Sequence, residues 1–157
     1  MYNHAPDDYV CPFCRIVQKL DEDRIPDIVY QNEDISVFIG LDHAPNNLGH
    51  AIIIPNQHFE NIYDLPLHLA TKIHDCARKL AWTLKESYSC EGTSLHQHNE
   101  PAGDQRVWHY HLHVLPRYKN DGVYTGLPVR RLTSSERAKY ARKLRTLLKE
   151  KLTIPSS

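Results

Sequence analysis

The chain has 157 residues, of which 41% are hydrophobic and 24% are charged, as expected for a globular protein with a buried core. Its 19 Lys and Arg residues balance its 19 Asp and Glu residues, so overall charge gives no argument for binding nucleic acid or a membrane surface. No apolar run approaches the roughly 20 residues that a bilayer span needs, and the first residues lack the pattern of a signal peptide. We therefore expect a cytoplasmic protein with one domain spanning 1–157.

The first half of the chain predicts short strands. Residues 27–31 and 34–41 are apolar segments separated by a short polar turn, which is typical of a hairpin. Residues 42–49 have the Pro, Asn and Gly content of a loop. The apolar run 50–55 is short enough for a buried strand. Three strands are therefore expected before residue 60.

A long helix follows, for which Asp64 is a suitable N-cap. Its apolar residues recur every three or four positions, the spacing of one helical face: Leu65, Leu69, Ile73, Ala77, Leu80 and Leu84. Residues 92–99 and 106–116 predict two more strands, joined by a turn-rich segment. Near the end, Thr133 and Glu136 have the spacing of a capping box, which predicts the start of a second helix.

This order of elements predicts an α+β fold, a mostly antiparallel sheet of about five strands covered by the long helix and a C-terminal helix. The motifs described below lie within about 10–120, and a C-terminal loop and helix occupy about 118–152. The segment 116–128, which leads into and includes this loop, is expected to be the most mobile part of the chain. Residues 129–151 hold nine basic and two acidic side chains, which predicts a solvated helix face or a surface that attracts polyphosphate.

Three alternating histidines are the most unusual feature of the sequence. His109, His111 and His113 lie in a predicted strand and would share one of its faces, while the residues between them, Trp108, Tyr110, Leu112 and Val114, would take the other. At about 3.3 Å per residue, the outer two are roughly 13 Å apart, too far for all three to share one metal ion. The rings must therefore have different tasks, and a neutral imidazole can be a metal ligand, a base or a nucleophile.

Eight further histidines bring the total to 11. Two of them, His96 and His98, share a face of the neighbouring predicted strand, and their role is left open. We expect four others at the surface: His4, His43, His68 and His74.

A cysteine pair near the start of the chain is the second unusual feature. The chain has four cysteines, too few for the disulfide framework of a small secreted domain, and only Cys11 and Cys14 are close together. Their spacing is that of half a zinc site or of a thiol redox motif. Zinc needs four ligands, and no second such pair lies nearby, so both interpretations stay open.

Residues 105–117, QRVWHYHLHVLPR, resemble the signature of the histidine triad (HIT) superfamily of nucleotide hydrolases and transferases. The cysteine pair, GHAIIIPNQH at 49–58 and HNEPAGDQ at 98–105 occur in the order that this family shows. The resemblance covers roughly residues 10–120 and implies a HIT-like fold.

The resemblance implies catalytic roles for four residues. The middle histidine, His111, would attack the α-phosphorus of a nucleotide and form a covalent nucleotidyl-histidine intermediate, which water or phosphate then cleaves. His113 would orient the site and stabilise phosphate charge, and His50 matches a further family histidine. Gln105 matches a polar position near the phosphate and the leaving group.

The resemblance also implies a nucleotide site, expected to take a purine nucleotide. Asp42 matches the residue that accepts the sugar hydroxyls, and Asn99 a polar position near the phosphate. Main-chain N–H groups near Arg106 and Val107 would face the non-bridging oxygens. Phe38, Ile39 and Leu41 would line the base pocket or else belong to the core of the strand. Asp104 departs from the family pattern, where a small residue is commoner, and this makes the leaving group uncertain.

Bacterial-type members with such a cysteine pair bind a structural zinc ion, which implies the ligand set Cys11, Cys14, His58 and His109. The family also implies a homodimer. The substrate would be a nucleoside phosphoramidate or a dinucleoside polyphosphate, and hydrolase, phosphorylase and transferase chemistry all stay open. Two other functions compete: a thiol redox protein that uses the cysteine pair, and a nucleotide-binding module without turnover.

Overall fold

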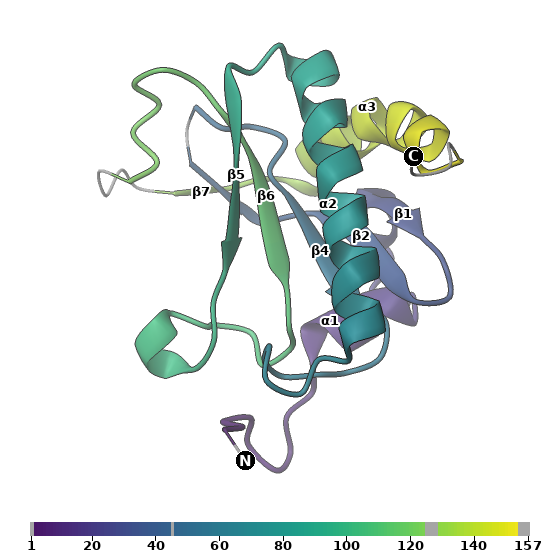
Figure 1. Ribbon diagram of the computed structural model, residues 1–157, viewed down its shortest axis with the longest axis vertical. Helices are drawn as coiled ribbons and strands as arrows, with labels where there is room; N and C mark the ends of the chain where they lie inside the picture. The colour runs from purple at the N-terminus through teal and green to yellow at the C-terminus, as the bar shows by residue number, and fades with distance from the viewer. Residues whose placement is uncertain (1, 45, 125–128, 154–157) are drawn as a thin grey trace.

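The computed structural model describes residues 2–44, 46–124 and 129–153 (Figure 1). Residues 125–128 of the expected mobile loop lie outside this range. The elements in chain order are α1 (Pro12–Val17), the 3-10 helix η1 (Glu22–Asp27), β1 (Ile28–Gln31), β2 (Ile35–Ile39), β3 (Asp42–His43), β4 (Ala51–Pro55), α2 (Leu67–Tyr88), β5 (Gly92–Gln97), the 3-10 helix η2 (Pro101–Gly103), β6 (Leu112–Arg117), β7 (Arg130–Arg131) and α3 (Ser134–Thr153). None of the helices in the described ranges is long and apolar enough to cross a membrane.

Five strands form one antiparallel sheet in the order β1-β2-β4-β6-β5, and β3 pairs with β7 in a separate two-stranded ribbon. The predicted α+β fold is confirmed. The predicted hairpin is also present, since the Asn32 side chain accepts hydrogen bonds from the backbone N–H groups of Asp34 and Ile35 and closes the turn between β1 and β2.

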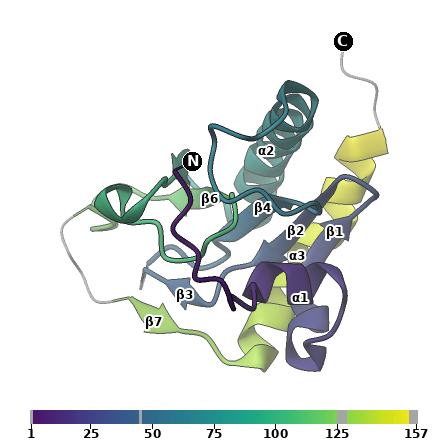
Figure 2. The ribbon, with the colours of Figure 1, turned by 90° about the horizontal axis from the view of Figure 1, so that it is seen from below.

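The two faces of the sheet carry different layers (Figure 2). On one face, α2 and α3 cover a core that includes Val37 and Ile39 of β2 and Ile53 of β4. On the other, α1 packs against Phe38 and the alternate residues of β4. Because successive side chains of a strand point to opposite faces, alternate residues of the same strands contribute to both layers. Strand β2 is therefore buried along its whole length.

The long helix begins at Leu67, so the prediction that Asp64 caps it is wrong. Pro66 precedes the first helical residue, and its carbonyl accepts from the N–H groups of Leu69 and Ala70 at 3.0 Å each. A residue before proline is kept out of the helical region, so the helix cannot extend back to residue 65.

Helix α3 begins with the predicted capping box. The Glu136 N–H donates to the Thr133 hydroxyl at 3.3 Å, and the Thr133 N–H donates to the Glu136 carboxylate at 2.9 Å. Its basic residues are not simply a solvated face, however. Arg137 is only 5% exposed, and its Nε lies 2.7 Å from a carboxylate oxygen of the fully buried Asp27. Part of the positive charge of α3 therefore fixes the helix to η1.

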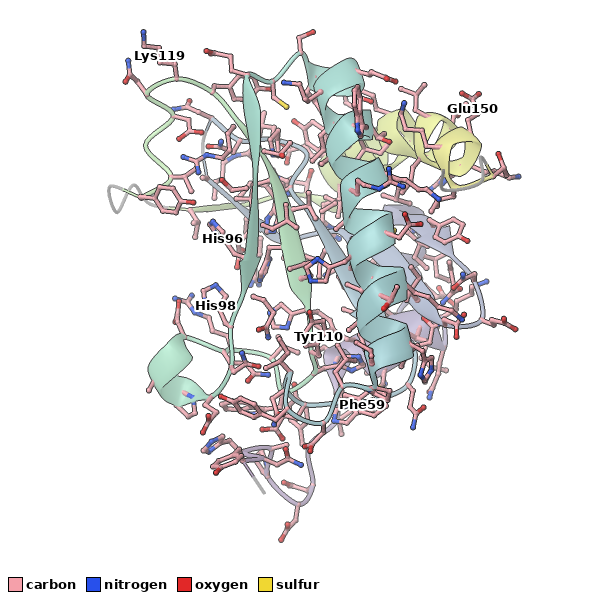
Figure 3. The ribbon with its side chains drawn as sticks, viewed as in Figure 1. Phe59, His96, His98, Tyr110, Lys119 and Glu150 are labelled. Carbon is pink, nitrogen blue, oxygen red and sulfur yellow. The ribbon has the colours of Figure 1, made fainter. Side chains whose placement is uncertain are left out.

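Strand β6 is shorter than predicted, because it begins at Leu112 and not at 106. Its last pair with β4 is Leu112 with Ile53, two residues before β4 ends, and Tyr110 N–H instead donates to the carbonyl of Phe59 in the segment after β4 (Figure 3). Only His113 of the three alternating histidines therefore lies within a strand. Trp108 is half-buried outside the main core, where its ring lies 5.7 Å from that of His4.

Candidate functional site

A cavity of about 340 Å³ opens on the α1 side of the sheet. Seven of the residues singled out in the sequence line it: Phe38, Leu41, Asp42, His50, Val107, His111 and His113. Three more had been named in the sequence in other terms: Arg106 for its backbone, Asp104 for its effect on the leaving group, and His98 with its role left open. Five line the cavity without having been singled out: Phe13, Arg24, Gly40, Ile52 and Val129. Of these, Ile52 could have been found, since it pairs with Phe38 across β2 and β4 and so shares its face. No sequence pattern pointed to Arg24.

Three of the expected residues do not line the cavity. Ile39 is fully buried under the helices, because it points to the opposite face of β2 from Phe38, so of its two expected places, the base pocket and the core of the strand, the structure has the core. Asn99 accepts from the N–H of Ile62 at 2.8 Å. Gln105 is 4% exposed and donates to the carbonyl of Glu60 at 2.6 Å. Both polar side chains hold loops together beside the cavity.

His111 has a fixed tautomer. Its Nδ1 lies 2.7 Å from the carbonyl oxygen of His109. A carbonyl only accepts hydrogen bonds, so Nδ1 carries the proton and Nε2 of the neutral ring keeps its lone pair. The Phe13 ring packs edge-on against His111, with the centroids 5.2 Å apart. The ring is thus held in one orientation on the wall of the cavity.

His50 and His113 form a hydrogen-bonded pair on the same wall. Nδ1 of His50 lies 3.2 Å from the carbonyl oxygen of Asp42, so this nitrogen is the donor. Nε2 of a neutral His50 then accepts from Nδ1 of His113 at 2.8 Å. This order of donors leaves Nε2 of His113 with its lone pair. The ring centroids of His113 and His111 are 4.8 Å apart.

Burial keeps these imidazoles neutral. Desolvation lowers the pKa of His50 to about 3, with further lowering by nearby histidines, His43 first among them. Desolvation, followed by the proximity of His50, lowers the pKa of His113 far below its ordinary value. Burial also lowers the pKa of His111. Near pH 7 the wall therefore presents lone pairs and not positive charges.

His43 is not at the surface, and the prediction that it would be is wrong. It is fully buried, with its ring 5.4 Å from that of His50 and stacked at 6.1 Å on Tyr140 of α3. Its Nε2 donates to the carbonyl of Gly40 at 3.2 Å. Burial lowers its pKa to about 4. A neutral histidine therefore supports His50 from behind, and packing of α3 covers it.

A separate cluster brings together Cys11, Cys14, His58 and His109, whose ligand atoms all lie within 4.8 Å of one another. Cys11 begins helix α1 and His109 belongs to the segment before β6. Nδ1 of His109 lies 3.4 Å from the Cys11 sulfur, and Nδ1 of His58 lies 3.4 Å from the Cys14 sulfur. Two thiols and two imidazoles can therefore meet one metal ion.

The tautomer of His109 suits a metal ligand. Its Nε2 lies 3.0 Å from the carbonyl oxygen of Pro55, so Nε2 carries the proton and Nδ1 directs its lone pair at the sulfur atoms. A histidine that binds a metal ion usually donates its other N–H to such a carbonyl. Two sulfur and two nitrogen ligands at these separations fit a closed tetrahedral site.

One side of the cavity is formed by the turn between β5 and β6. Asp104 lies there with a positive φ of 64°, a conformation in which a residue without a Cβ is less strained. Its carboxylate pairs with Arg106, Nε to Oδ1 at 3.2 Å, and both side chains are largely exposed. The departure from the family pattern at 104 therefore places an ion pair at the rim of the cavity.

Comparisons with known proteins agree with this geometry. Residues 23–120 match the family model described as HIT domain. "Protein hit" of Bacillus subtilis is 32% identical over 114 residues, covering 71% of this chain and 74% of that protein. Adenosine 5'-monophosphoramidase HNT1 of Saccharomyces cerevisiae is 31% identical over 123 residues, covering 77% of this chain and 72% of that protein. A solved Zn-bound histidine triad family protein of Mycobacterium smegmatis superposes with a TM-score of 0.73 at 28% identity, covering 89% of this chain and 94% of that one.

Proposed function

The chain belongs to the HIT domain family, and from that premise we propose that it is a nucleotide hydrolase or nucleotidyl transferase acting at the α-phosphorus of its substrate. The substrate class is a nucleoside phosphoramidate or a dinucleoside polyphosphate, with a purine base. A relative named adenosine 5'-monophosphoramidase supports the first of these.

The observation that carries this proposal is the tautomer of His111. Its Nδ1–H is donated to the carbonyl of His109, so Nε2 is a nucleophile that needs no base to remove a proton. Attack of Nε2 on the α-phosphorus expels the leaving group and forms a nucleotidyl-His111 intermediate. Water or another acceptor then attacks the same phosphorus and releases His111. Direct displacement of the leaving group by water is thus replaced by two displacements at phosphorus, each with a lower barrier.

Two groups surround the position that the phosphate would occupy. The ring of His113, fixed by its hydrogen bond to His50 at 2.8 Å, would bound the position of the α-phosphate beside His111. Main-chain N–H groups near Arg106 and Val107 stabilise charge on the non-bridging oxygens. Gln105 acts indirectly, because its amide donates to the carbonyl of Val107 at 3.1 Å and so shapes that backbone.

The nucleoside would occupy the part of the cavity that lies over β2 and β4. Phe38, Leu41 and Ile52 offer an apolar surface for the base. The carboxylate of Asp42 is about half-exposed, pairs with Arg131 at 3.2 Å, and is available to accept the hydroxyls of the sugar. Asn99, expected near the phosphate, would instead position the backbone at Ile62, from whose N–H it accepts.

We propose that the ion held by Cys11, Cys14, His58 and His109 is zinc, in a structural role. A Zn-bound relative and the closed ligand set support this assignment. The ion would cross-link α1 to the segment that holds His109, the residue whose carbonyl fixes His111. The thiol redox alternative is weaker, because both sulfur atoms face imidazole nitrogens and a redox role uses neither imidazole.

We propose a homodimer formed at the edge of the sheet. Strand β5 is an edge strand, with no partner beyond it among the described residues, and Leu95 on it is 43% exposed. Sedimentation equilibrium tests this point, since a monomer at micromolar concentration would contradict it.

The test of the proposed function compares the wild type with His111→Asn on adenosine 5'-phosphoramidate and on diadenosine triphosphate. The wild type is expected to hydrolyse at least one compound, and His111→Asn is expected to lose the activity while still binding adenosine monophosphate. His68→Asn, at an exposed position of α2, is the control for loss of a histidine. A wild type that turns over neither compound refutes the proposal. A phosphorus label trapped on His111 would distinguish a covalent route from direct attack by water.

A further inference from the structure

His98 occupies a place on the cavity wall that the proposed chemistry has not used. It follows β5 directly and lies next to the turn that contains η2 (Figure 3). In the sheet, β6 lies between β4 and β5, so His113 sits between His50, which precedes β4, and His98. The ring centroids of His98 and His113 are 5.9 Å apart. His98 therefore lines the end of the cavity opposite the proposed nucleoside end.

The tautomer of His98 is fixed, like that of His111. Its Nδ1 lies 2.7 Å from the carbonyl oxygen of Gly103, so Nδ1 carries a proton in every charge state. Nε2 is then the nitrogen that gains or releases a proton. In the protonated ring Nε2–H is a donor, and in the neutral ring Nε2 is an acceptor.

The turn that positions His98 is held in a costly conformation. Glu100 has φ 61° and ψ 166°, a region that glycine occupies almost alone, and Asp104 has φ 64°. Strain of this kind costs about 1–3 kcal/mol for each residue and persists where surrounding contacts enforce it, which is often at functional sites. Here the buried Gln105 enforces it, because its side-chain oxygen accepts from the N–H of Glu100 at 2.7 Å. The turn sets the carbonyl of Gly103 against His98.

The neighbouring groups are poor proton donors. His113 and His50 are kept neutral by burial, which lowers the pKa of His50 to about 3 and that of His113 further. Asp104 is ion-paired with Arg106 at 3.2 Å, and an arginine does not release its proton near pH 7. These groups leave His98, held by Gly103 and beside His113, as the candidate proton donor on this end of the wall.

We propose that His98 is a catalytic general acid and base that protonates the leaving group as it departs from the α-phosphorus. This role rests on the proposed function. As Nε2 of His111 bonds to phosphorus, the P–N bond of a phosphoramidate breaks, its electron pair stays on nitrogen, and Nε2–H of His98 supplies the proton. The amine leaves and His98 becomes neutral. In the second step water attacks phosphorus, the P–His111 bond breaks, and Nε2 of His98 takes the proton of the water.

The test uses two substrates with the same nucleotide and different leaving groups: adenosine 5'-phosphoramidate and the p-nitrophenyl ester of adenosine monophosphate. The first leaving group needs a proton to depart, and the second does not. His98→Gln is expected to lower kcat/KM for the phosphoramidate by about 100-fold or more. The same variant should keep kcat/KM for the p-nitrophenyl ester near the wild-type value, because p-nitrophenolate leaves without a proton and kcat/KM reports only the steps up to its departure. His98→Asn gives a second variant without an acid, and melting curves and binding of adenosine monophosphate show that each variant is folded.

His96→Gln is the matched control. His96 lies on the same face of β5, its Nε2 is 2.8 Å from the hydroxyl of Tyr124, and it does not line the cavity, so both rates should stay at the wild-type level. The role of His98 as the acid is wrong if the His98 variants lower kcat/KM for both substrates by one factor, or change neither value. Failure of the proposed function gives a different result, because the wild type itself then hydrolyses neither substrate. That result overturns both the proposed function and the role of His98.

Discussion

Replacing His43 by leucine should remove a large part of the dependence of stability on pH. His43 is fully buried, and its pKa in the folded protein is about 4, against about 6.5 for an ordinary histidine. Between these two values the unfolded chain binds a proton that the folded protein does not. Lowering the pH from 6.5 to 4 therefore favours unfolding, and below pH 4 both states are protonated and the effect levels off.

The size of the effect follows from the difference between the two pKa values. At 1.36 kcal/mol for each pKa unit, a difference of about 2.5 units corresponds to about 3 kcal/mol of unfolding free energy. The groups around the ring act in both directions: Arg130 opposes protonation of His43, and the carbonyl of Gly40 and the carboxylate of Asp42 favour it. Burial is the largest cause, so the sign is set by desolvation.

The assay is urea unfolding of the wild type and His43→Leu at several pH values between 7.5 and 4. The difference between their unfolding free energies removes contributions that both proteins share, such as those of buried histidines elsewhere. The wild type should lose about 3 kcal/mol more than the variant on acidification. His74→Leu, at an exposed position of α2, controls for the loss of one histidine. If the curves of the wild type and His43→Leu run parallel, the argument from burial is refuted.

Other predictions concern packing, buried charge and metal. Leu80→Ala, in the core beneath α2, should lower the unfolding free energy by about 2–5 kcal/mol, whereas Leu67→Ala, 81% exposed, should change it by less than about 0.5 kcal/mol in the same urea titration. Asp27→Asn should lower it by about 3 kcal/mol, because it leaves the buried guanidinium of Arg137 without its carboxylate. Cys14→Ser or a strong chelator should release one zinc ion, measured by elemental analysis, and lower the melting temperature; protein purified without stoichiometric zinc would contradict this.

Much of the site was visible in local patterns. His111 and His113 stood out in the alternating row, the resemblance to the HIT family added Phe38, Asp42 and His50, and the structure places all of them on one cavity. The sheet and both long helices were predicted because periodicity depends only on neighbours along the chain. The cysteine pair and two distant histidines were joined through a resemblance, and the structure brings their ligand atoms within 4.8 Å of one another.

The errors at Ile39 and His43 share one physical cause: distant contacts decide which way a side chain faces and whether it is buried. Strand β2 is buried on both faces, so Phe38 and Ile39 are equally apolar, and only the layers packed on the sheet decide which of them meets the cavity. The buried His43 was expected at the surface because its cover, Tyr140 of α3, lies nearly 100 residues later in the chain.

The sequence by itself determined which chemical groups this protein has and along which elements they are spaced, because residue type and periodicity are local properties. Only the tertiary structure decided what each imidazole can do. The free nitrogen of His111, His109 and His98 is set by the carbonyl of His109, Pro55 or Gly103 that holds the other nitrogen. The carbonyl of Pro55 lies 54 residues from His109 along the chain. The backbone that carries the nearer carbonyls of His109 and Gly103 is held by contacts to Phe59 and Glu60. Packing of separate segments therefore gives identical side chains different tasks.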